Sequence, residues 1–512
     1  MIGVFGLIVF SSCFFLFVST QSELAPDEDI GFAFSINETD GYSSREYLDH
    51  YFEEAQKTAL AQDNIDHIFT FASNQGGSTN TGFMGLILPP WSERDQTTAE
   101  VIAQVTPELK KIGGVRPAVI LPPALPTPGQ GYPVEFVLKS TASPETLYEV
   151  GNELIGRAMA TNKFIFLAPR LRIDRPEASV TIDRDKAAAL GVDMRRLATD
   201  LTTLLATGEA GRFAYEGRSY KVIPQLQRDA RLNPEQILSH YTRNRDGDLV
   251  LLANLLSIEE RATPRTIEHA QQLNSNILIG VPRPGVPQGE ALEILDSIAA
   301  EILPDSFQVD YAGPSRQFKQ EGSALLATFG FALLIIYLVL AAQFESFRDP
   351  LIMLVTVPMS ICGALLVLNI LGMTNGMGLT SFPGMTLNIY TQVGLVTLIG
   401  VISKHGILIV EFANKLQEQG LSKREAIEEA ASIRMRPVLM TTAALVVAMF
   451  PLLVADGPGA ASRFSMGLII ASGMTIGTLF TLYVVPAAYL YIGRDHAKGR
   501  QAVETQAQAA QA

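Results

Sequence analysis

The segment QVGLVTLIGVISKHGILIVEFAN, residues 392–414, combines the length of a membrane-spanning helix with a lysine near its middle. About 20 apolar residues are enough for a helix to cross the hydrocarbon core of a bilayer. Lys404 lies nine residues before Ala413, roughly 13 Å along a helix axis, which is farther than a lysine side chain reaches. An ammonium at that depth costs about 2.5–3.5 kcal/mol on insertion scales. The sequence therefore predicts that Lys404 has a charged partner or a function.

This segment lies in one of six apolar runs, and five of the six are close together between residues 323 and 492. The six runs are Met1–Thr20, Ser323–Phe344, Leu351–Leu371, Asn388–Ala413, Pro437–Ala455 and Phe464–Ile492. Five such runs joined by short loops predict a bundle of transmembrane helices rather than buried core helices. The first run could also be a signal peptide. We favour a retained helix, because no Lys or Arg precedes it and no A-x-A cleavage site follows cleanly.

Composition and motifs exclude several classes of protein. The chain has 512 residues, of which 18% are charged, compared with about 25% in soluble proteins. A formal net charge of −13 without a basic patch excludes a nucleic-acid partner. Cys13 and Cys362 lie in apolar runs, and two cysteines are too few for a disulfide framework or a zinc site. No P-loop, G-x-S-x-G, H-E-x-x-H or C-x-x-C motif occurs. The sequence therefore gives little support for an enzyme, and we expect neither catalytic residues nor a metal site.

Basic residues predict how the chain is oriented in the membrane. They gather in alternate links, at Arg348, between Lys415 and Arg436, and in the tail of residues 493–512. Because cytoplasmic loops carry an excess of Lys and Arg, these links and the tail are predicted to face the cytoplasm. The long segment 22–320 is then predicted to lie outside it.

The external segment has a repeated pattern of strands and helices. Residues 22–130 show the order βαββαβ, which is typical of a ferredoxin-like, or split βαβ, fold. The same pattern recurs in residues 131–179 and 263–320, where helix Gln288–Leu303 and strand Phe307–Tyr311 complete it. We interpret residues 180–262 as an inserted subdomain. The fold class predicted is therefore a membrane protein with six transmembrane helices and a large α+β external region.

Two stretches of the chain resemble resistance–nodulation–division (RND) efflux pumps. Residues 392–414 are very similar to the tenth membrane helix of that family, and RMRPVLMTT at 434–442 is similar to the start of the next helix. Supporting matches are ELAPDED at 23–29, TNTG at 79–82, IDRDKAAALG at 182–191 and AQFES at 342–346. The branch it resembles is that of the hydrophobe/amphiphile, or multidrug, exporters of Gram-negative bacteria.

The resemblance implies an architecture and a place in the cell. The chain is similar to the second half of such a pump, with 1–20 as membrane helix seven and 323–492 as the remaining five. Residues 22–130 would be one porter subdomain, 131–179 with 263–320 a second, and 180–262 a docking subdomain. Family members are homotrimers in the inner membrane, with large periplasmic domains. They join a periplasmic adaptor protein and an outer-membrane channel, and they exchange protons for drugs without a cofactor.

The resemblance also implies a proton relay. In the family, a lysine, an arginine and a threonine face an aspartate pair from the first half, and the matching positions here are Lys404, Arg434 and Thr441. The apolar runs contain no interior Asp or Glu. A partner for Lys404 must therefore come from another chain or from sequence not present here. We expect the neighbouring His405 to be a packed or hydrogen-bonded residue rather than a relay member.

The predicted drug pocket departs from the family pattern. Drug pumps often carry a phenylalanine-rich loop at the position of Asn74-Gln-Gly-Gly-Ser78, which is short and has no aromatic residue. Phe69, Gln75 and Gly76 are the pocket candidates, although Phe69 could equally be a core residue.

Two other functions remain open. The chain could be a non-transporting fragment or partner subunit of a pump. It could also export metal ions, but its external methionines, Met84, Met159 and Met194, have no ligand-like spacing.

Overall fold

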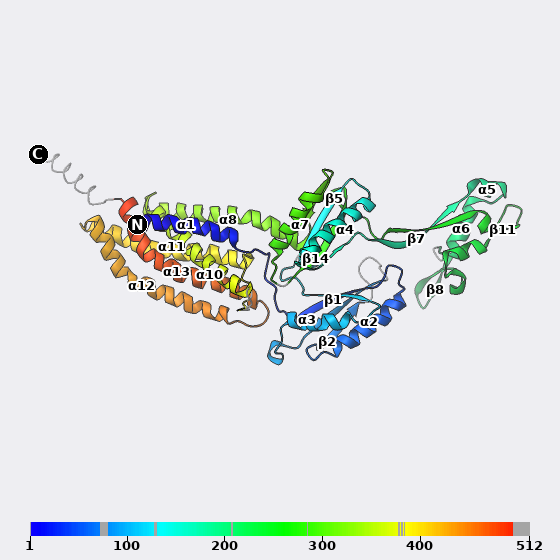
Figure 1. The fold of residues 1–512 in the computed structure, drawn as a ribbon, viewed down its shortest axis with the longest axis horizontal. Coiled ribbons are helices and arrows are strands. Elements are labelled where there is room, and N and C mark those ends of the chain that lie inside the picture. Colours follow the sequence, from blue (N-terminus) through cyan, green and yellow to red (C-terminus); the bar gives the residue numbers. More distant parts are fainter. Residues whose placement is uncertain are drawn as a thin grey trace. The chain divides into compact units, whose positions relative to one another are not determined.

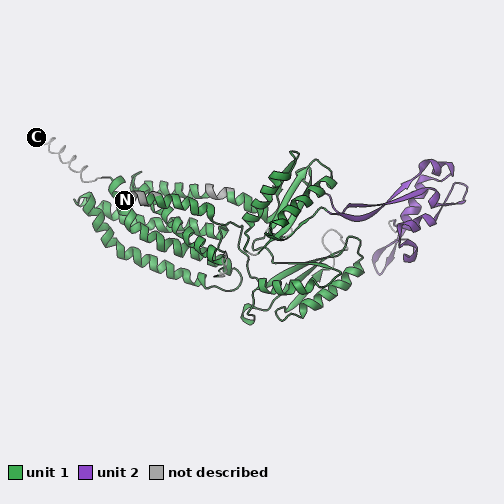
Figure 2. Cartoon of the chain, in the orientation of Figure 1, with its two compact units in different colours: residues 1–171, 268–512 green, residues 172–267 purple. Residues whose placement is uncertain are grey.

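The computed structural model describes residues 2–71, 80–126, 131–205, 208–283, 285–376, 379, 382 and 384–494. The chain forms two compact units, Arg172–Ile267 and the remainder (Figure 2). The larger unit contains a helical bundle and two sheet modules (Figure 1).

Long apolar helices form the bundle, in which α10, α11 and α12 each pack against α13. Five helices in the described part of the chain are long and apolar enough to cross a membrane. They are α8 (Gly313–Phe344), α9 (Asp349–Leu354) continued by α10 (Thr356–Gly376), α11 (Ile389–Glu418), α12 (Lys423–Leu453) and α13 (Ala460–Ile492). Gly477 of α13 allows close packing, because a Cβ there would lie 2.6 Å from the Cβ of Ser360.

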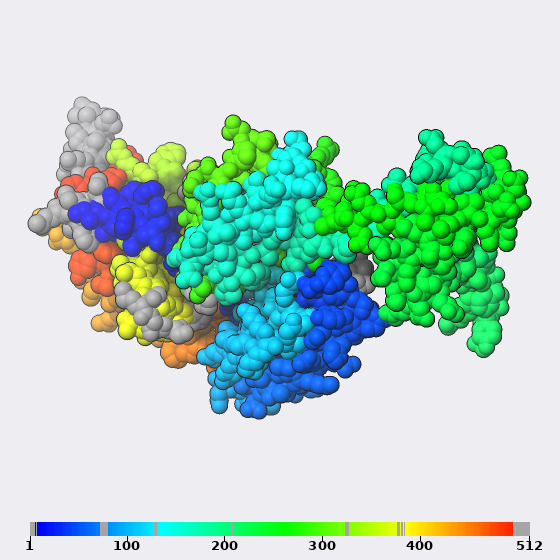
Figure 3. All heavy atoms as spheres, turned by 45° about the vertical axis from the view of Figure 1, so that its right-hand side comes forward, coloured from blue at the N-terminus to red at the C-terminus, as the bar shows by residue number. Residues whose placement is uncertain are grey.

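The sixth apolar run forms α1 (Ile2–Ser19), which packs against α10. Its stretch Ile8–Ser19 is apolar but shorter than the five spanning helices. Phe10, Phe14 and Phe15 are exposed on the surface of the bundle, where α1 is dark blue in Figure 3. The expectation of six spanning helices is thus met for five, and the sixth stays a prediction.

Two helices begin earlier than their apolar runs indicate. α8 starts at Gly313 rather than at Ser323, and α12 starts at Lys423 rather than at Pro437. Hydropathy detects only the part of a helix that lies in lipid, whereas capping decides where the helix begins. At α12 the Ser422 side chain accepts a hydrogen bond from the backbone N–H of Glu425, and the Glu425 carboxylate accepts from the N–H of Ser422.

The first sheet module follows the βαββαβ order. Its elements are β1 (Phe32–Glu38), α2 (Arg45–Leu60), β2 (His67–Phe71), β3 (Thr81–Ile87), the 3₁₀ turn Trp91–Glu93, α3 (Thr98–Leu109) and β4 (Arg116–Ile120). The strands pair in the order β2-β3-β1-β4, and all neighbours are antiparallel. The core between sheet and helices contains Phe52, Met84 and Leu109.

The second sheet module repeats this arrangement with a chain insertion. Its elements are β5 (Val134–Ser140), α4 (Pro144–Ala160), β6 (Phe164–Pro169), β13 (Glu268–Ala270), β14 (Leu273–Pro282), α7 (Gln288–Ile302) and β15 (Phe307–Tyr311). β14 pairs with β5 and β6, and β15 pairs with the other side of β5. The four main strands therefore have the order β6-β14-β5-β15, which matches that of the first module. Phe136, Leu154 and Leu292 lie in its core.

The smaller unit, Arg172–Ile267, leaves the second sheet module between β6 and β13. A long antiparallel ribbon, β7 (Ile173–Ile182) with β12 (Leu256–Pro264), begins and ends it. The other elements are α5 (Arg184–Ala189), α6 (Met194–Leu204), the hairpins β8 (Gly211–Tyr215) with β9 (Arg218–Val222) and β10 (Tyr241–Arg243) with β11 (Leu249–Leu251), and three 3₁₀ turns, Arg228–Arg231, Pro234–Ser239 and Leu252–Asn254. The unit contains the predicted segment 180–262 and adds residues 172–179 and 263–267, which include the start of β7 and the end of β12.

Candidate functional site

Two neighbouring residues of helix α11, Lys404 and His405, differ in their exposure. Lys404 is exposed, and it makes no hydrogen bond or ion pair with any residue in the described part of the chain. His405, one position on, is only 1% exposed. Successive residues on a helix are 100° apart, so one side chain faces out of the bundle and the other into it.

Threonines of α12 and α13 hold the buried histidine. The Oγ1 atom of Thr441 lies 3.4 Å from Nε2 of His405, and that of Thr478 lies 3.4 Å from Nδ1. Thr478 also shares a 2.9 Å hydrogen bond with Thr442. A buried polar cluster therefore links three helices of the bundle. The expectation that His405 is a packed, hydrogen-bonded residue is confirmed.

Arg434 lies on α12 seven residues, or two turns, before Thr441 and so on the same face of the helix. Its guanidinium is 4.6 Å from the ring centroid of Phe412, a cation–π contact. Its buried Nε has no hydrogen-bond partner among the described residues. Like Lys404, this cation has no carboxylate in the part of the chain that the structure describes.

The nearby carboxylates are already occupied or too distant. Glu411 of α11 pairs with Lys415 at 2.7 Å. Asp349 lies just outside the predicted run Leu351–Leu371, but it is only 3% exposed and begins a membrane-spanning range. Its Oδ2 accepts a 3.3 Å hydrogen bond from Asn414, which is ten residues beyond Lys404 on α11, or about 15 Å along the axis. Asp349 is therefore not the partner of Lys404.

Sequence reasoning missed Asp349 because the residue precedes its apolar run by two positions, and it missed Thr442 and Thr478 because a threonine in a helix is unremarkable. The structure places Asp349 in a buried polar cluster. Tyr489 donates to Asn414 at 2.5 Å, and Gln417 donates to Tyr489 at 2.7 Å. This cluster ties the neighbouring ends of α9, α11 and α13 together.

A connecting segment of residues 20–31, here called the strap, joins α1 to the first sheet module and is bonded to the bundle. The backbone of residues 21–24 pairs with Leu387 and Ile389 at the start of α11. The carboxylate of Glu28 accepts hydrogen bonds from the backbone N–H groups of Ala461 and Ser462, at 3.2 and 2.7 Å. These groups are the unsatisfied donors of the first turn of α13, where a negative charge is stabilised.

The strap also holds both sheet modules. Asp29 accepts from Arg94 at 2.6 Å and from the hydroxyl of Thr98, at the start of α3, at 2.5 Å. The backbone of Leu24 donates to the side chain of Gln288, in the first turn of α7, at 3.2 Å. A movement of α11 or α13 would therefore act directly on helices of both modules.

One carboxyl group of the strap has an unusual proton affinity. Burial raises the pKa of Glu23 to about 7, although a 2.5 Å hydrogen bond from Thr386 acts in the opposite direction. The nearby charge of Asp27 raises the pKa further. Glu23 can therefore gain or lose a proton near neutral pH.

The pocket candidates lie in the first sheet module. Phe69 is 38% exposed, so it is a surface residue of the sheet and not a core residue. It stacks on Phe32 with centroids 6.0 Å apart and contacts the rings of Phe71 and Phe83. Gln75 and Gly76, the other two candidates, lie outside the described residues.

The chain was compared with known proteins. The family model described as AcrB/AcrD/AcrF matches residues 1–493. An uncharacterized transporter of Haemophilus influenzae is 37% identical over 494 residues, which cover 96% of this chain and 47% of that protein. The multidrug/solvent efflux pump membrane transporter MepB of Pseudomonas putida is 29% identical over 486 residues, covering 93% and 45%. Multidrug resistance protein MdtF of Escherichia coli (strain K12) is 27% identical over 507 residues, covering 97% and 48%.

The chain thus spans about half the length of the curated relatives it matches. The match to the family model extends over the bundle, both sheet modules and the smaller unit. Two of these relatives are named as a transporter and an efflux pump membrane transporter, and the third as a multidrug resistance protein. The chain belongs to the AcrB/AcrD/AcrF family of RND transporters.

Proposed function

We propose that this chain is the C-terminal half of an inner-membrane pump that exports hydrophobic and amphiphilic compounds in exchange for protons. The observation that carries the proposal is the pair of cations Lys404 and Arg434. They lie on two apolar helices and have no carboxylate among the described residues. Uncompensated charges in a membrane are costly and mark functional sites. A first half that brings an aspartate pair to this face would supply the missing charge.

The mechanism follows from the charge of that pair. Ionised aspartates attract Lys404, and protonation of the aspartates removes the attraction. Lys404 is then released, and α11 shifts relative to the helix that carries the aspartates. Thr441 of α12 lies at hydrogen-bond range of His405, which adjoins Lys404 on α11. A shift of α11 would therefore act directly on α12 through Thr441 and on α13 through Thr478.

The strap supports coupling between this site and the external modules. It bonds to the starts of α11 and α13 and to α3 and α7. A rotation or translation of the membrane helices would thus change the spacing of the two sheet modules. We assign these modules to the two porter subdomains, and Arg172–Ile267 to the docking subdomain.

The exported compounds would contact the aromatic surface of the first module. Phe69 and Phe71 are 38% and 60% exposed, and their rings are edge-to-face with centroids 5.8 Å apart. Phe34 and Ile279 are buried in a cluster that joins the two modules, and Phe83 packs against it. The exposed phenylalanines lie beside this junction, because both Phe69 and Phe71 contact Phe83. Apolar and aromatic walls are typical of sites for hydrophobic ligands.

In the cell, the complete pump would be a homotrimer in the bacterial inner membrane. It would work with a periplasmic adaptor protein, an outer-membrane channel and the proton gradient. These partners are proposed from the family to which the chain belongs.

The relay is tested by efflux of a fluorescent amphiphilic dye from cells that produce the native protein. Lys404→Ala should raise dye accumulation to the level of cells lacking the protein, with unchanged amounts in the membrane. Lys415→Ala is the matched control, because Lys415 lies on the same helix but already has Glu411 as its partner. Full efflux by Lys404→Ala would refute the relay role.

The second candidate function is a partner subunit that carries no protons itself, which the unpaired cations also permit. A blot of source membranes with an antibody against residues 493–512 distinguishes the two. A band near twice 55.5 kDa is expected for a pump that carries both halves in one polypeptide. A band at 55.5 kDa would contradict that and point to a separate subunit.

A further inference from the structure

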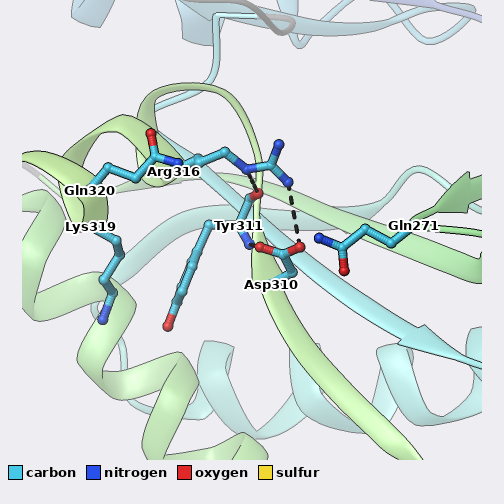
Figure 4. Close-up of a pocket in the computed structure, with 6 residues that line it drawn as sticks. All are labelled: Gln271, Asp310, Tyr311, Arg316, Lys319 and Gln320. Carbon is cyan, nitrogen blue, oxygen red and sulfur yellow. Dashed lines mark hydrogen bonds and ion pairs between the residues drawn. The ribbon is translucent and has the colours of Figure 1, made fainter.

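A polar cavity of about 360 Å³ lies at the edge of the second sheet module, where β15 continues into α8 (Figure 4). Six residues line it: Gln271, Asp310, Tyr311, Arg316, Lys319 and Gln320. They come from the β13–β14 turn, the end of β15 and the first turns of α8. Neither the proton relay nor the aromatic surface uses any of them.

The cavity has an excess of positive charge. Lys139, only 6% exposed, lies 3.3 Å from Asp310 and donates to Gln271 at 2.5 Å. Arg316 approaches the same carboxylate at 3.5 Å, and Lys319 pairs with Asp296 at 2.8 Å. Among the residues that line the cavity, Arg316 and Lys319 are cations and Asp310 is the one carboxylate.

Several donors remain directed at the cavity. Arg316 uses Nε for the carbonyl oxygen of Tyr311, at 2.7 Å, and Nη2 for the long contact with Asp310. Its Nη1 has no hydrogen bond to any residue that the structure describes, and its side chain is 49% exposed. Gln271 uses its oxygen for Lys139, so its amide N–H groups are available. A guanidinium edge beside an amide is a donor arrangement suited to phosphate or carboxylate oxygens.

The backbone at Gln271 adopts a conformation that is unfavourable for a glutamine. Gln271 and Gln272 form the two-residue turn between β13 and β14, with φ values of +52° and +68°. Such turns normally contain Asn or Gly, because longer side chains disfavour the left-handed region. The turn nevertheless places the Gln271 side chain at the cavity, where Figure 4 shows its amide facing Asp310, the carboxylate that Arg316 also approaches. Strain at a site of this kind is an indication of ligand binding.

The position along α8 indicates where the anion comes from. Lys319 precedes Ala324, the first of the long apolar stretch, by five residues, or about 7.5 Å along the helix. This places Lys319 and the Tyr311 ring, which are 4.9 Å apart, at the depth of the lipid headgroups. Lysine and tyrosine are typical anchors at that level.

We propose that this cavity binds the phosphate group of an anionic phospholipid from the outer leaflet of the membrane. Arg316 and the Gln271 amide would donate to the phosphate oxygens, and Lys319 would contribute its charge. The bound lipid would fix the start of α8 against the second sheet module.

The test is native mass spectrometry of the full protein released from nanodiscs containing phosphatidylglycerol or phosphatidylcholine. We expect phosphatidylglycerol to be retained, and Arg316→Gln to lower its retention about tenfold, since one charge-assisted contact is lost. Arg463→Gln is the matched control, because Arg463 is an exposed cation at the start of α13, away from the cavity. Equal retention of both lipids, or equal losses in the two variants, would overturn the proposal.

A second arm separates lipid from free phosphate. Calorimetric titration of inorganic phosphate into the protein in neutral detergent should show binding that is far weaker than that of the lipid. Binding of inorganic phosphate as tight as that of phosphatidylglycerol would overturn the lipid assignment. Arg316→Lys keeps the charge but not the planar donor pair, so it should recover only part of the lipid retention. Full recovery would contradict a role for the guanidinium geometry.

Discussion

Two lysines of this chain, one inside a sheet module and one in a membrane helix, differ in whether they have a partner. Lys139, in the middle of the second sheet module, has Asp310 at 3.3 Å and Gln271 at 2.5 Å. Lys404, in the middle of α11, has neither a carboxylate nor an amide partner within the described residues. Both positions are costly for an ammonium. The difference indicates that the first charge is part of the fold, whereas the second has no role in holding together the part of the chain that the structure describes.

The largest effect on stability is expected from Lys139→Met. Removing one member of a buried ion pair leaves an uncompensated carboxylate and costs about 3 kcal/mol, although Arg316 remains near Asp310. Chemical unfolding of the protein in detergent measures the loss. Lys186→Met is the control, because the exposed Lys186–Asp183 pair contributes less than about 1 kcal/mol. Equal losses in the two variants would remove the distinction between a structural and a surface lysine.

Lys404→Met should be favourable, in contrast to the destabilising Lys139→Met. Replacing an ammonium that has no partner favours insertion of the α11 segment by about 2.5 kcal/mol on insertion scales. An insertion assay that compares the glycosylation of wild-type and variant segments gives this quantity. A variant that inserts less well than wild type would show that Lys404 already has a compensating partner in the membrane.

Two carboxylates extend the comparison to pH. Burial acts to raise the pKa of Asp310, but hydrogen bonds from the Tyr311 backbone and Lys139 hold it below its ordinary value. Its contribution to stability is therefore present above about pH 4 and is lost as the pH falls through the lowered pKa. Glu23 has no cationic partner among the described residues, and its pKa is raised from 4.5 to about 7. Its contribution is complete below pH 4.5 and is lost as the pH rises through about 7.

Between pH 5 and 8, Glu23→Gln should accordingly flatten the decline of stability with rising pH, and Asp310→Asn should leave its slope unchanged. Thermal unfolding at a series of pH values measures both slopes. An unchanged slope in Glu23→Gln would show that Glu23 titrates at an ordinary pKa.

The smallest effect is expected from Thr478→Val. This change removes the contacts of Thr478 with His405 and Thr442 but preserves side-chain shape. Interhelical hydrogen bonds in membranes contribute about 0.6 kcal/mol on average, so thermal stability should fall only slightly. A loss of several kcal/mol would mean that the polar cluster, and not apolar packing, holds α11 to α13.

The comparison also shows what a sequence can and cannot predict. Strand β15, Phe307–Tyr311, was predicted to the residue, and α7 to within one residue, because alternation and amphipathic spacing are local signals. Lys404 was identified as a candidate because a charge within an apolar run is visible in one dimension. Lys139 was not identified, because a lysine in a strand normally indicates a solvent-facing position. Its partners are 132 and 171 residues away in the sequence.

The strap and Asp349 were also not identified, again because their partners are far away in the sequence. The strap resembles an ordinary polar linker in the sequence, and its partners become apparent only when the starts of α3, α7, α11 and α13 meet beside it. Asp349 was missed because hydropathy does not report burial at the end of a helix. Tertiary contacts between distant segments, rather than local propensity, decide these sites.

The bond between Glu28 and Ala461 also has a consequence for how the protein is made. The two residues are 433 positions apart, so Glu28 leaves the ribosome roughly 20–90 seconds before its partner, at about 5–20 residues per second. Throughout that interval the start of α13 does not exist, and the strap can complete only its contacts with the modules and with the start of α11. The anchor that links both modules to α13 is therefore set only after the modules and the helices α8 to α12 have been translated.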